Sequence, residues 1–179
     1  MLVLVVGPSG AGKDTMLGIA RRALAGDPRF RFVRRVITRP AGAGGEDHEA
    51  VPEETFLRRA FALRWQAHGL HYGIPLDVID DLMRGTVSIA NVSRGVVAGA
   101  VAKFPVRVIE VTAPPEILAR RLAERGREAA DDVVRRLARD VPIPDYVAVD
   151  TIVNDKAPAA AGDRFVAALI RAASPARPG

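Results

Sequence analysis

Residues 2–15 read LVLVVGPSGAGKDT and decide the fold. The apolar run Leu2–Val6 predicts a buried strand, and the glycine-rich turn after it opens a helix at Lys13. Glycine adopts backbone conformations closed to other residues, so successive N–H groups can turn toward one anion at the helix N-terminus. The stretch predicts a P-loop for a nucleoside triphosphate, with the binding residues Gly7, Pro8, Ser9, Gly10, Ala11, Gly12, Lys13, Asp14 and Thr15. The alternative is a glycine turn that only joins strand to helix.

The residues at the end of the motif differ from the usual pattern. A Ser or Thr normally follows the lysine and binds Mg²⁺, but here Asp14 follows and Thr15 comes one step later. A strand expected at 86–91 ends in Asn91, about where many P-loop proteins carry a metal-associated acid. We therefore expect Asp14 to hold or orient Mg²⁺, since a carboxylate is a good ligand for that ion. The alternative is that Asp14 only favours the helix N-terminus.

Short apolar segments alternate with helical patterns along the chain, which predicts an α/β fold with a parallel sheet and helices on both faces. This is the three-layer arrangement of P-loop NTPases. The expected strands are 2–6, 30–37, 86–91, 106–111 and 146–153. The expected helices are 13–24, 76–84, 95–103, 115–125, 130–140 and 159–173.

Two segments break this alternation within a single domain of residues 1–179. Residues 39–73 hold a Gly/Pro-rich loop, a short helix and two short strands joined at His68-Gly69, which predicts an insertion with its own hairpin. Residues 120–139 are the second such segment and are rich in arginine. The remaining core is then about 1–38, 74–119 and 140–173.

Composition narrows the classes of function. The chain has 179 residues, 49% of them hydrophobic, and a net charge of +5 that suits a polyanionic ligand. It has no cysteine, which excludes disulfides and thiolate metal sites and favours a reducing cytoplasm. No run of apolar residues is long enough to cross a membrane, and nothing resembles a signal peptide. Nucleic-acid binding is disfavoured because only 5% of residues are aromatic and no known module occurs.

From residue 2 to about residue 170 the chain resembles the guanylate kinase superfamily. The matching motifs are the P-loop, VITR at 36–39, GEDH at 45–48, ETF at 54–56, GLHYG at 69–73, RL at 121–122, RG at 125–126, RL at 136–137 and VND at 153–155. Within the superfamily, the details resemble the ribose 1,5-bisphosphate phosphokinases. Those details are GKD at 12–14, Trp65, Ser93-Arg94 and RGRE at 125–128.

The resemblance implies a kinase that uses ATP and Mg²⁺ to convert ribose 1,5-bisphosphate to 5-phosphoribosyl 1-diphosphate in phosphonate breakdown. It implies that residues 120–139 form a lid, and it implies catalytic roles for Lys13, Arg121, Arg125 and Arg136, with Asn154 added to the ATP site. The implied acceptor residues are Arg39, Glu46, His48, Tyr72 and Arg94. Several of these have ordinary alternatives, because rows of arginine are often solvated helix faces and a loop histidine is often incidental.

Departures from ordinary guanylate kinases favour an acceptor without a base. Gly42 stands where those enzymes have a second arginine, His48 where they have a tyrosine, and Asn91 where they have an aspartate. A nucleoside monophosphate kinase and a non-catalytic guanylate-kinase-like binding module remain as alternatives. Related kinases also suggest a homodimer, although no residue here demonstrates one.

Overall fold

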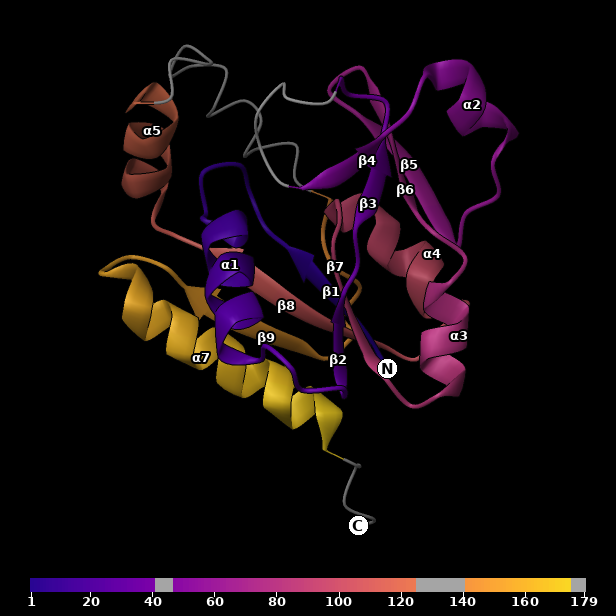
Figure 1. Ribbon diagram of the computed structural model, residues 1–179. Coiled ribbons are helices and arrows are strands. Elements are labelled where there is room, and N and C mark those ends of the chain that lie inside the picture. The colour runs from indigo at the N-terminus through magenta and orange to yellow at the C-terminus, as the bar shows by residue number, and fades with distance from the viewer. Residues whose placement is uncertain (41–46, 125–140, 175–179) are drawn as a thin grey trace.

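The computed structural model describes residues 1–40, 47–124 and 141–174. Its core is a five-stranded sheet in the order β2-β7-β1-β8-β9, with every neighbouring pair parallel (Figure 1). The strands are β1 Leu2–Val6, β2 Phe30–Phe32, β7 Val87–Asn91, β8 Val106–Thr112 and β9 Val149–Val153. The helices are α1 Lys13–Ala23, α2 Glu53–Arg58, α3 Val78–Met83, α4 Val97–Val101, α5 Pro115–Glu124 and α7 Pro158–Ala173, with a 3₁₀ turn η1 at Arg94–Val96.

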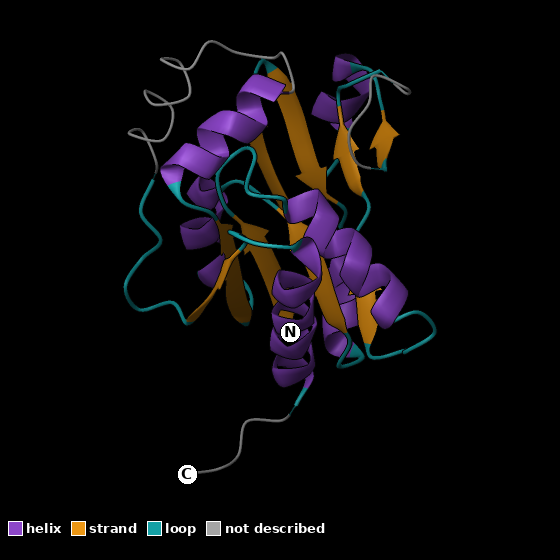
Figure 2. Cartoon of the chain, turned by 90° about the vertical axis from the view of Figure 1, so that its left-hand side faces the viewer, coloured by secondary structure: helices purple, strands orange, loops and turns teal. Residues whose placement is uncertain are grey.

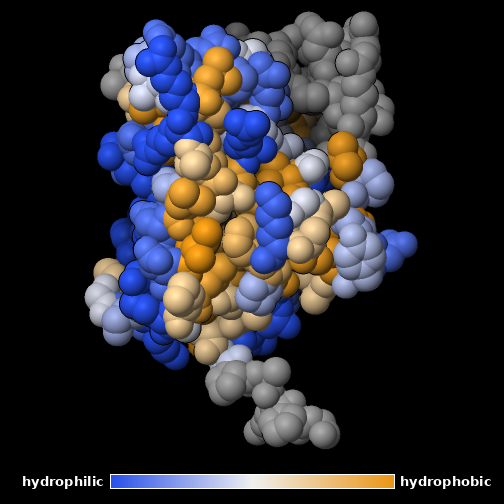
Figure 3. Space-filling model, turned by 90° about the vertical axis from the view of Figure 1, so that its right-hand side faces the viewer, coloured by the Kyte–Doolittle hydropathy of each residue, from blue (hydrophilic) through white to orange (hydrophobic). Residues whose placement is uncertain are grey.

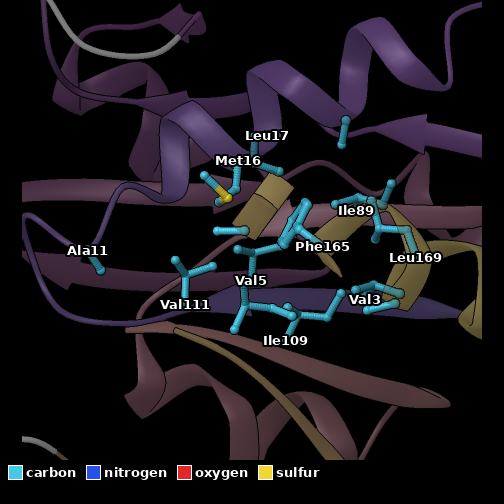
Figure 4. Close-up of a cluster of buried hydrophobic side chains, with 14 of the residues drawn as sticks. Val3, Val5, Ala11, Met16, Leu17, Ile89, Ile109, Val111, Phe165 and Leu169 are labelled. Atoms are coloured by element: carbon cyan, nitrogen blue, oxygen red, sulfur yellow. The ribbon is translucent and has the colours of Figure 1, made fainter. Parts of the chain in front are cut away.

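Alternate residues of β1 enter two hydrophobic clusters on opposite faces of this sheet. Val3 and Val5 belong to the cluster that α1 and α7 cover, in which Phe165 is fully buried (Figure 4). Leu2, Leu4 and Val6 belong to the cluster under α3 and α4. Because side chains alternate between the faces of a strand, an all-apolar strand has to be covered on both sides. The predicted three-layer α/β class is confirmed, and Figure 2 shows helices stacked against the sheet.

One predicted strand is wrong. Residues 30–37 were expected to form a single strand, but they divide between two sheets: β2 pairs with β7 in the core, and β3, Arg35–Ile37, pairs with β6. Apolar periodicity reports that a segment is extended and half-buried, and it does not report which partner the segment meets. The helix expected at 130–140 lies outside the described residues.

The second sheet has four strands in the order β4-β3-β6-β5 and stands beside the core at the upper right of Figure 1. Its remaining strands are β4 His48–Ala50, β5 Leu63–Ala67 and β6 Leu70–Ile74. The predicted hairpin at His68-Gly69 is confirmed, with Ala67 opposite Leu70 and positive φ angles of 53° and 72° at the two turn residues. Two successive positive φ angles are the hallmark of the tight hairpin turn that matches strand twist.

The side of the molecule that carries α3 and α4 is shown in Figure 3, with apolar side chains gathered over its centre. A hollow of about 440 Å³ lies between β5 and α4, lined among others by Trp65, Gly99 and Lys103. In the part of the chain that the structure describes, no helix combines the length and apolarity that a membrane crossing needs.

Candidate active site at the carboxyl end of the central strands

The P-loop follows β1 and wraps around the side chain of Lys13. The Nζ of Lys13 donates hydrogen bonds to the carbonyl oxygens of Gly7 at 2.7 Å and Pro8 at 3.0 Å. Gly10 and Gly12 have φ angles of 82° and 92°, a region in which a side chain is strained. The loop therefore fixes the Lys13 ammonium beside two of its own carbonyl oxygens. Its backbone also turns as an anion-binding loop requires.

Asp14 lies beside Asn91, as the departure from the usual motif suggested. The Nδ2 of Asn91 donates to Oδ1 of Asp14 at 3.3 Å, although the two residues are 77 positions apart. Asp14 and Thr15 are both exposed at the start of α1. Among the described residues no group of three or more His, Cys, Asp or Glu side chains could hold a metal. One carboxylate completed by phosphate oxygens and water is nevertheless the usual protein contribution to a Mg²⁺ site, so Asp14 fits that ion.

Asn154 lies directly beneath the P-loop. Its Nδ2 donates to the carbonyl oxygen of Ala11 at 2.9 Å, and its backbone N–H donates to Thr112 at 2.7 Å. The residue is only 3% exposed, and its Oδ1 is buried without a hydrogen-bond partner in the described chain. A Cβ on Gly12 would come within 2.4 Å of the same amide nitrogen. The side chain therefore braces the loop from below.

Replacing Asn154 with alanine is expected to lower the free energy of unfolding by about 2 kcal/mol, because it removes the donor to a buried carbonyl. The KM for ATP should rise with it, since the loop loses its brace. Urea unfolding followed by circular dichroism measures the first effect, and steady-state kinetics measures the second. Thr151→Ala, at an exposed position on β9, the strand just before Asn154, serves as the control. Equal stabilities for the two variants would contradict the bracing role.

Arg121 is the predicted lid arginine that the structure places at the P-loop. It extends from α5, and its Nη1 donates to the carbonyl oxygen of Gly10 at 3.4 Å. The neighbouring Leu122 packs so closely on Gly10 that a Cβ there would lie 3.2 Å from its Cγ. Three other predicted site residues, Glu46, Arg125 and Arg136, lie outside the described residues.

Three predicted acceptor residues, Arg39, His48 and Tyr72, lie together at the second sheet. Nη2 of Arg39 approaches the Tyr72 hydroxyl at 3.5 Å, and the His48 ring lies 3.3 Å from the Arg39 carbonyl oxygen. Thr38 fixes the same region, because its hydroxyl accepts a hydrogen bond from the backbone of His71 at 2.9 Å. In Figure 1 this sheet and α5 stand on either side of the upper edge of the core sheet.

Arg94, another predicted acceptor residue, forms an ion pair with Glu110 on β8. Both side chains are largely buried, at 15% and 21% exposure. Glu110 lies opposite Val6, at the point where the P-loop leaves β1. Sequence reasoning missed this carboxylate, although the one acid in a strand of mostly apolar residues was the signal that marks it.

Arg35 is a second residue that sequence reasoning missed. It begins β3, and its guanidinium carbon lies 5.2 Å from the ring centre of Tyr72 and 5.9 Å from that of Trp65. Burial lowers the pKa of the Arg35 guanidinium to about 10, while Tyr72 and Asp14 favour its charged form and Arg39 opposes it. At neutral pH the group is still a cation. A charged residue in a strand expected to be buried on both faces was the available signal.

Comparisons with known proteins identify the family, although no family model matches the chain. The chain is 53% identical over 170 residues to the ribose 1,5-bisphosphate phosphokinase PhnN of Acidiphilium cryptum, covering 95% of this chain and 92% of the relative. It is 44% identical over 183 residues to the protein of that name from Agrobacterium fabrum, covering 99% of this chain and all of the relative. The chain belongs to the ribose 1,5-bisphosphate phosphokinase family. The predicted family is confirmed.

This ribose 1,5-bisphosphate phosphokinase family member has a guanylate-kinase-like fold. A solved guanylate kinase from Anaplasma phagocytophilum superposes with a TM-score of 0.69 over 98% of this chain and 87% of that chain, at 18% identity. Identity this low establishes the shared fold alone. With family and fold together, the protein is a phosphotransferase, and the kinase family implies ATP as its co-substrate.

Proposed function

We propose that this protein transfers the γ-phosphoryl group of ATP to ribose 1,5-bisphosphate, giving 5-phosphoribosyl 1-diphosphate and ADP. The observation that carries the proposal is family membership along 95% of the chain. The site geometry supports it, because the cations Lys13 and Arg121 lie at the P-loop and Arg39, just after β3, lies beside Tyr72 of the second sheet. A place in phosphonate breakdown follows from the resemblance.

The proposed reaction needs no general base. A phosphate on the anomeric carbon carries a charge of about −1.5 to −2 near pH 7, so its oxygen attacks the γ-phosphorus directly. A new O–P bond forms as the bond between the γ-phosphorus and the β,γ-bridging oxygen breaks, and ADP leaves. The obstacle is repulsion between two polyanions. Catalysis therefore depends on neutralising charge, aligning the reactants and excluding water.

The positions of the described side chains support several of the proposed roles. Lys13 neutralises the terminal phosphates of ATP, and Arg121 at Gly10 is placed to contact the transferred group. Arg39 and Tyr72 bind the reacting phosphate of the acceptor, with His48 beside them. Arg125 and Arg136 in the lid, Glu46 and Arg94 toward the acceptor, and Asn154 on the nucleotide side keep their predicted roles. The insertion is then the acceptor-binding part of the enzyme.

Asp14, beside Asn91, is the residue that would hold Mg²⁺. When bound, the ion would neutralise charge on the phosphates of ATP. Asp14→Ala is expected to raise the Mg²⁺ concentration for half-maximal rate and to lower kcat by roughly 100-fold. Steady-state rates over a Mg²⁺ titration measure both quantities.

The matched control for Asp14→Ala is Asp80→Ala, which also removes a carboxylate from the first turn of a helix. If Asp14 only favours its helix N-terminus, both variants lose a little stability and keep the Mg²⁺ dependence of the parent enzyme. That outcome would contradict a role at the metal.

An acceptor panel tests the proposed function. Purified protein with Mg-ATP is supplied with ribose 1,5-bisphosphate or GMP, and ADP and the phosphorylated product are quantified. We expect rapid turnover of the sugar bisphosphate and little of GMP. Rapid turnover of GMP alone would make the protein a nucleoside monophosphate kinase, and turnover of neither acceptor would favour a binding module.

The proposed partners are small molecules, ATP and the sugar bisphosphate, with no nucleic acid or membrane among them. The proposed compartment is the cytoplasm. Association into a homodimer stays a prediction from the resemblance.

A further inference from the structure

Arg35 lies on one face of the second sheet together with an aromatic pair. Ile37 is opposite Tyr72, and Tyr72 is opposite Trp65, so these side chains share the face that Arg35 also occupies two residues before Ile37. The rings of Trp65 and Tyr72 stack at 5.3 Å with an interplanar angle of 10°. The guanidinium of Arg35 is placed over both rings by cation–π contacts.

Two other charged groups act electrostatically on Arg35. Arg35 interacts electrostatically with Asp14 at the start of α1 and with Arg39 at the end of its own segment. The attraction of Asp14 and the repulsion of Arg39 both act on a cation that has lost much of its hydration. An anion that arrives between the two arginines relieves their repulsion, and a partly desolvated cation binds it more strongly than a surface arginine would.

Arg35 and Arg39 approach Tyr72 from two directions. Arg35 lies over the ring face, and Arg39 lies at the hydroxyl end, with Nη2 at 3.5 Å from the oxygen. The two cations therefore occupy separate positions around one side chain. A small acceptor that carries two phosphates needs a pair of cationic positions of this kind.

We propose that Arg35 binds the non-reacting phosphate of the acceptor, the one on C5 of the sugar, and so selects a doubly phosphorylated substrate. This inference rests on the proposed function, in which Arg39 and Tyr72 bind the reacting phosphate on C1. Arg35 is then a specificity-determining residue, since it contacts the end of the substrate at which no bond changes.

Steady-state kinetics with two acceptors tests which of the two phosphates Arg35 binds. Arg35→Gln is expected to lower kcat/KM for ribose 1,5-bisphosphate on the order of 100-fold, because a charge-assisted bidentate contact is lost. With ribose 1-phosphate, which lacks the second phosphate, kcat/KM should change by less than about threefold on the same grounds. Arg35→Lys should lose less kcat/KM than Arg35→Gln, since lysine keeps the positive charge but lacks the planar guanidinium that makes two hydrogen bonds. Arg64→Gln, an exposed arginine on β5, is the control and should leave both values unchanged.

The single tryptophan gives a binding measurement that does not depend on turnover. Trp65 lies 5.9 Å from Arg35, so its fluorescence should change as ribose 5-phosphate is titrated in. We expect the Kd for ribose 5-phosphate to rise on the order of 100-fold in Arg35→Gln and to stay the same in Arg64→Gln. Circular dichroism confirms that each variant is folded.

Two results would overturn the inference while the proposed function stands. One is an equal loss of kcat/KM with both acceptors, which would assign Arg35 to the reacting phosphate or to the fold. The other is unchanged affinity for ribose 5-phosphate in Arg35→Gln. If the unmodified enzyme does not phosphorylate ribose 1,5-bisphosphate at all, the proposed function itself fails.

Discussion

Replacing Lys13 with methionine is expected to lower kcat by roughly 1,000-fold, the scale seen when one preorganised charge is removed from a transition state. The ammonium is held at 2.7 and 3.0 Å from two carbonyl oxygens of the loop, so it already points where the terminal phosphates bind. Methionine keeps the length and apolar stem of the side chain while removing the charge. Initial rates of ADP formation with ribose 1,5-bisphosphate measure the loss.

The Lys13→Arg enzyme should also lose most of its kcat, although the side chain keeps its positive charge. This variant therefore tests the shape of the side chain separately from its charge. The planar fork of arginine is larger than an ammonium and does not fit between the carbonyls of Gly7 and Pro8. Lys103→Met, at an exposed position after α4, controls for the loss of any lysine. An enzyme in which Lys13→Met retains more than a tenth of its rate would refute the assigned role.

Gly7→Ala is expected to lower the free energy of unfolding by about 3 kcal/mol, from backbone strain and from overpacking together. Gly7 has a φ angle of 139°, and a Cβ there would lie 1.9 Å from the carbonyl oxygen of Val111 on β8. Because that neighbour is backbone in the centre of the sheet, no side-chain rotation relieves the clash. Urea denaturation measures the loss, and the KM for ATP should rise in parallel.

Gly26→Ala separates the two causes. Gly26 also has a positive φ, 82°, but no atom lies within 4 Å of a Cβ placed there. The free energy of unfolding of Gly26→Ala should therefore fall only by the part that comes from backbone strain, about 1 kcal/mol. If Gly7→Ala is no more destabilised than Gly26→Ala, the close approach of β1 and β8 at the P-loop does not limit stability.

The parts of the site that follow one another along the chain could be predicted from sequence. Leu2–Val6 and the loop after it are a local signal, since strand, turn and helix start within 14 residues. The proximity of Asp14 to Asn91 was also accessible, because the carboxyl ends of neighbouring parallel strands meet at one edge of the sheet.

The parts that depend on which strands meet could not be predicted. The division of residues 30–37 between two sheets places Arg35 beside Tyr72 and Trp65, and no local pattern contains that pairing. Glu110 belongs to the site through its ion pair with Arg94, which is 16 positions away on another element. Arg125 and Arg136 lie outside the described residues, so the roles predicted for them stay predictions.

The brace beneath the P-loop has a consequence for how the protein is made. Ala11 and Asn154 are 143 positions apart, yet the side-chain amide of Asn154 donates a hydrogen bond to the loop at the carbonyl oxygen of Ala11. Proteins leave the ribosome from their N-terminus, so Lys13 emerges long before the residue that supports its loop. A nascent chain that stops before β9 carries the whole nucleotide motif but lacks a finished binding site. The nucleotide site is therefore complete only once β9 and Asn154 have been made and have folded against the loop.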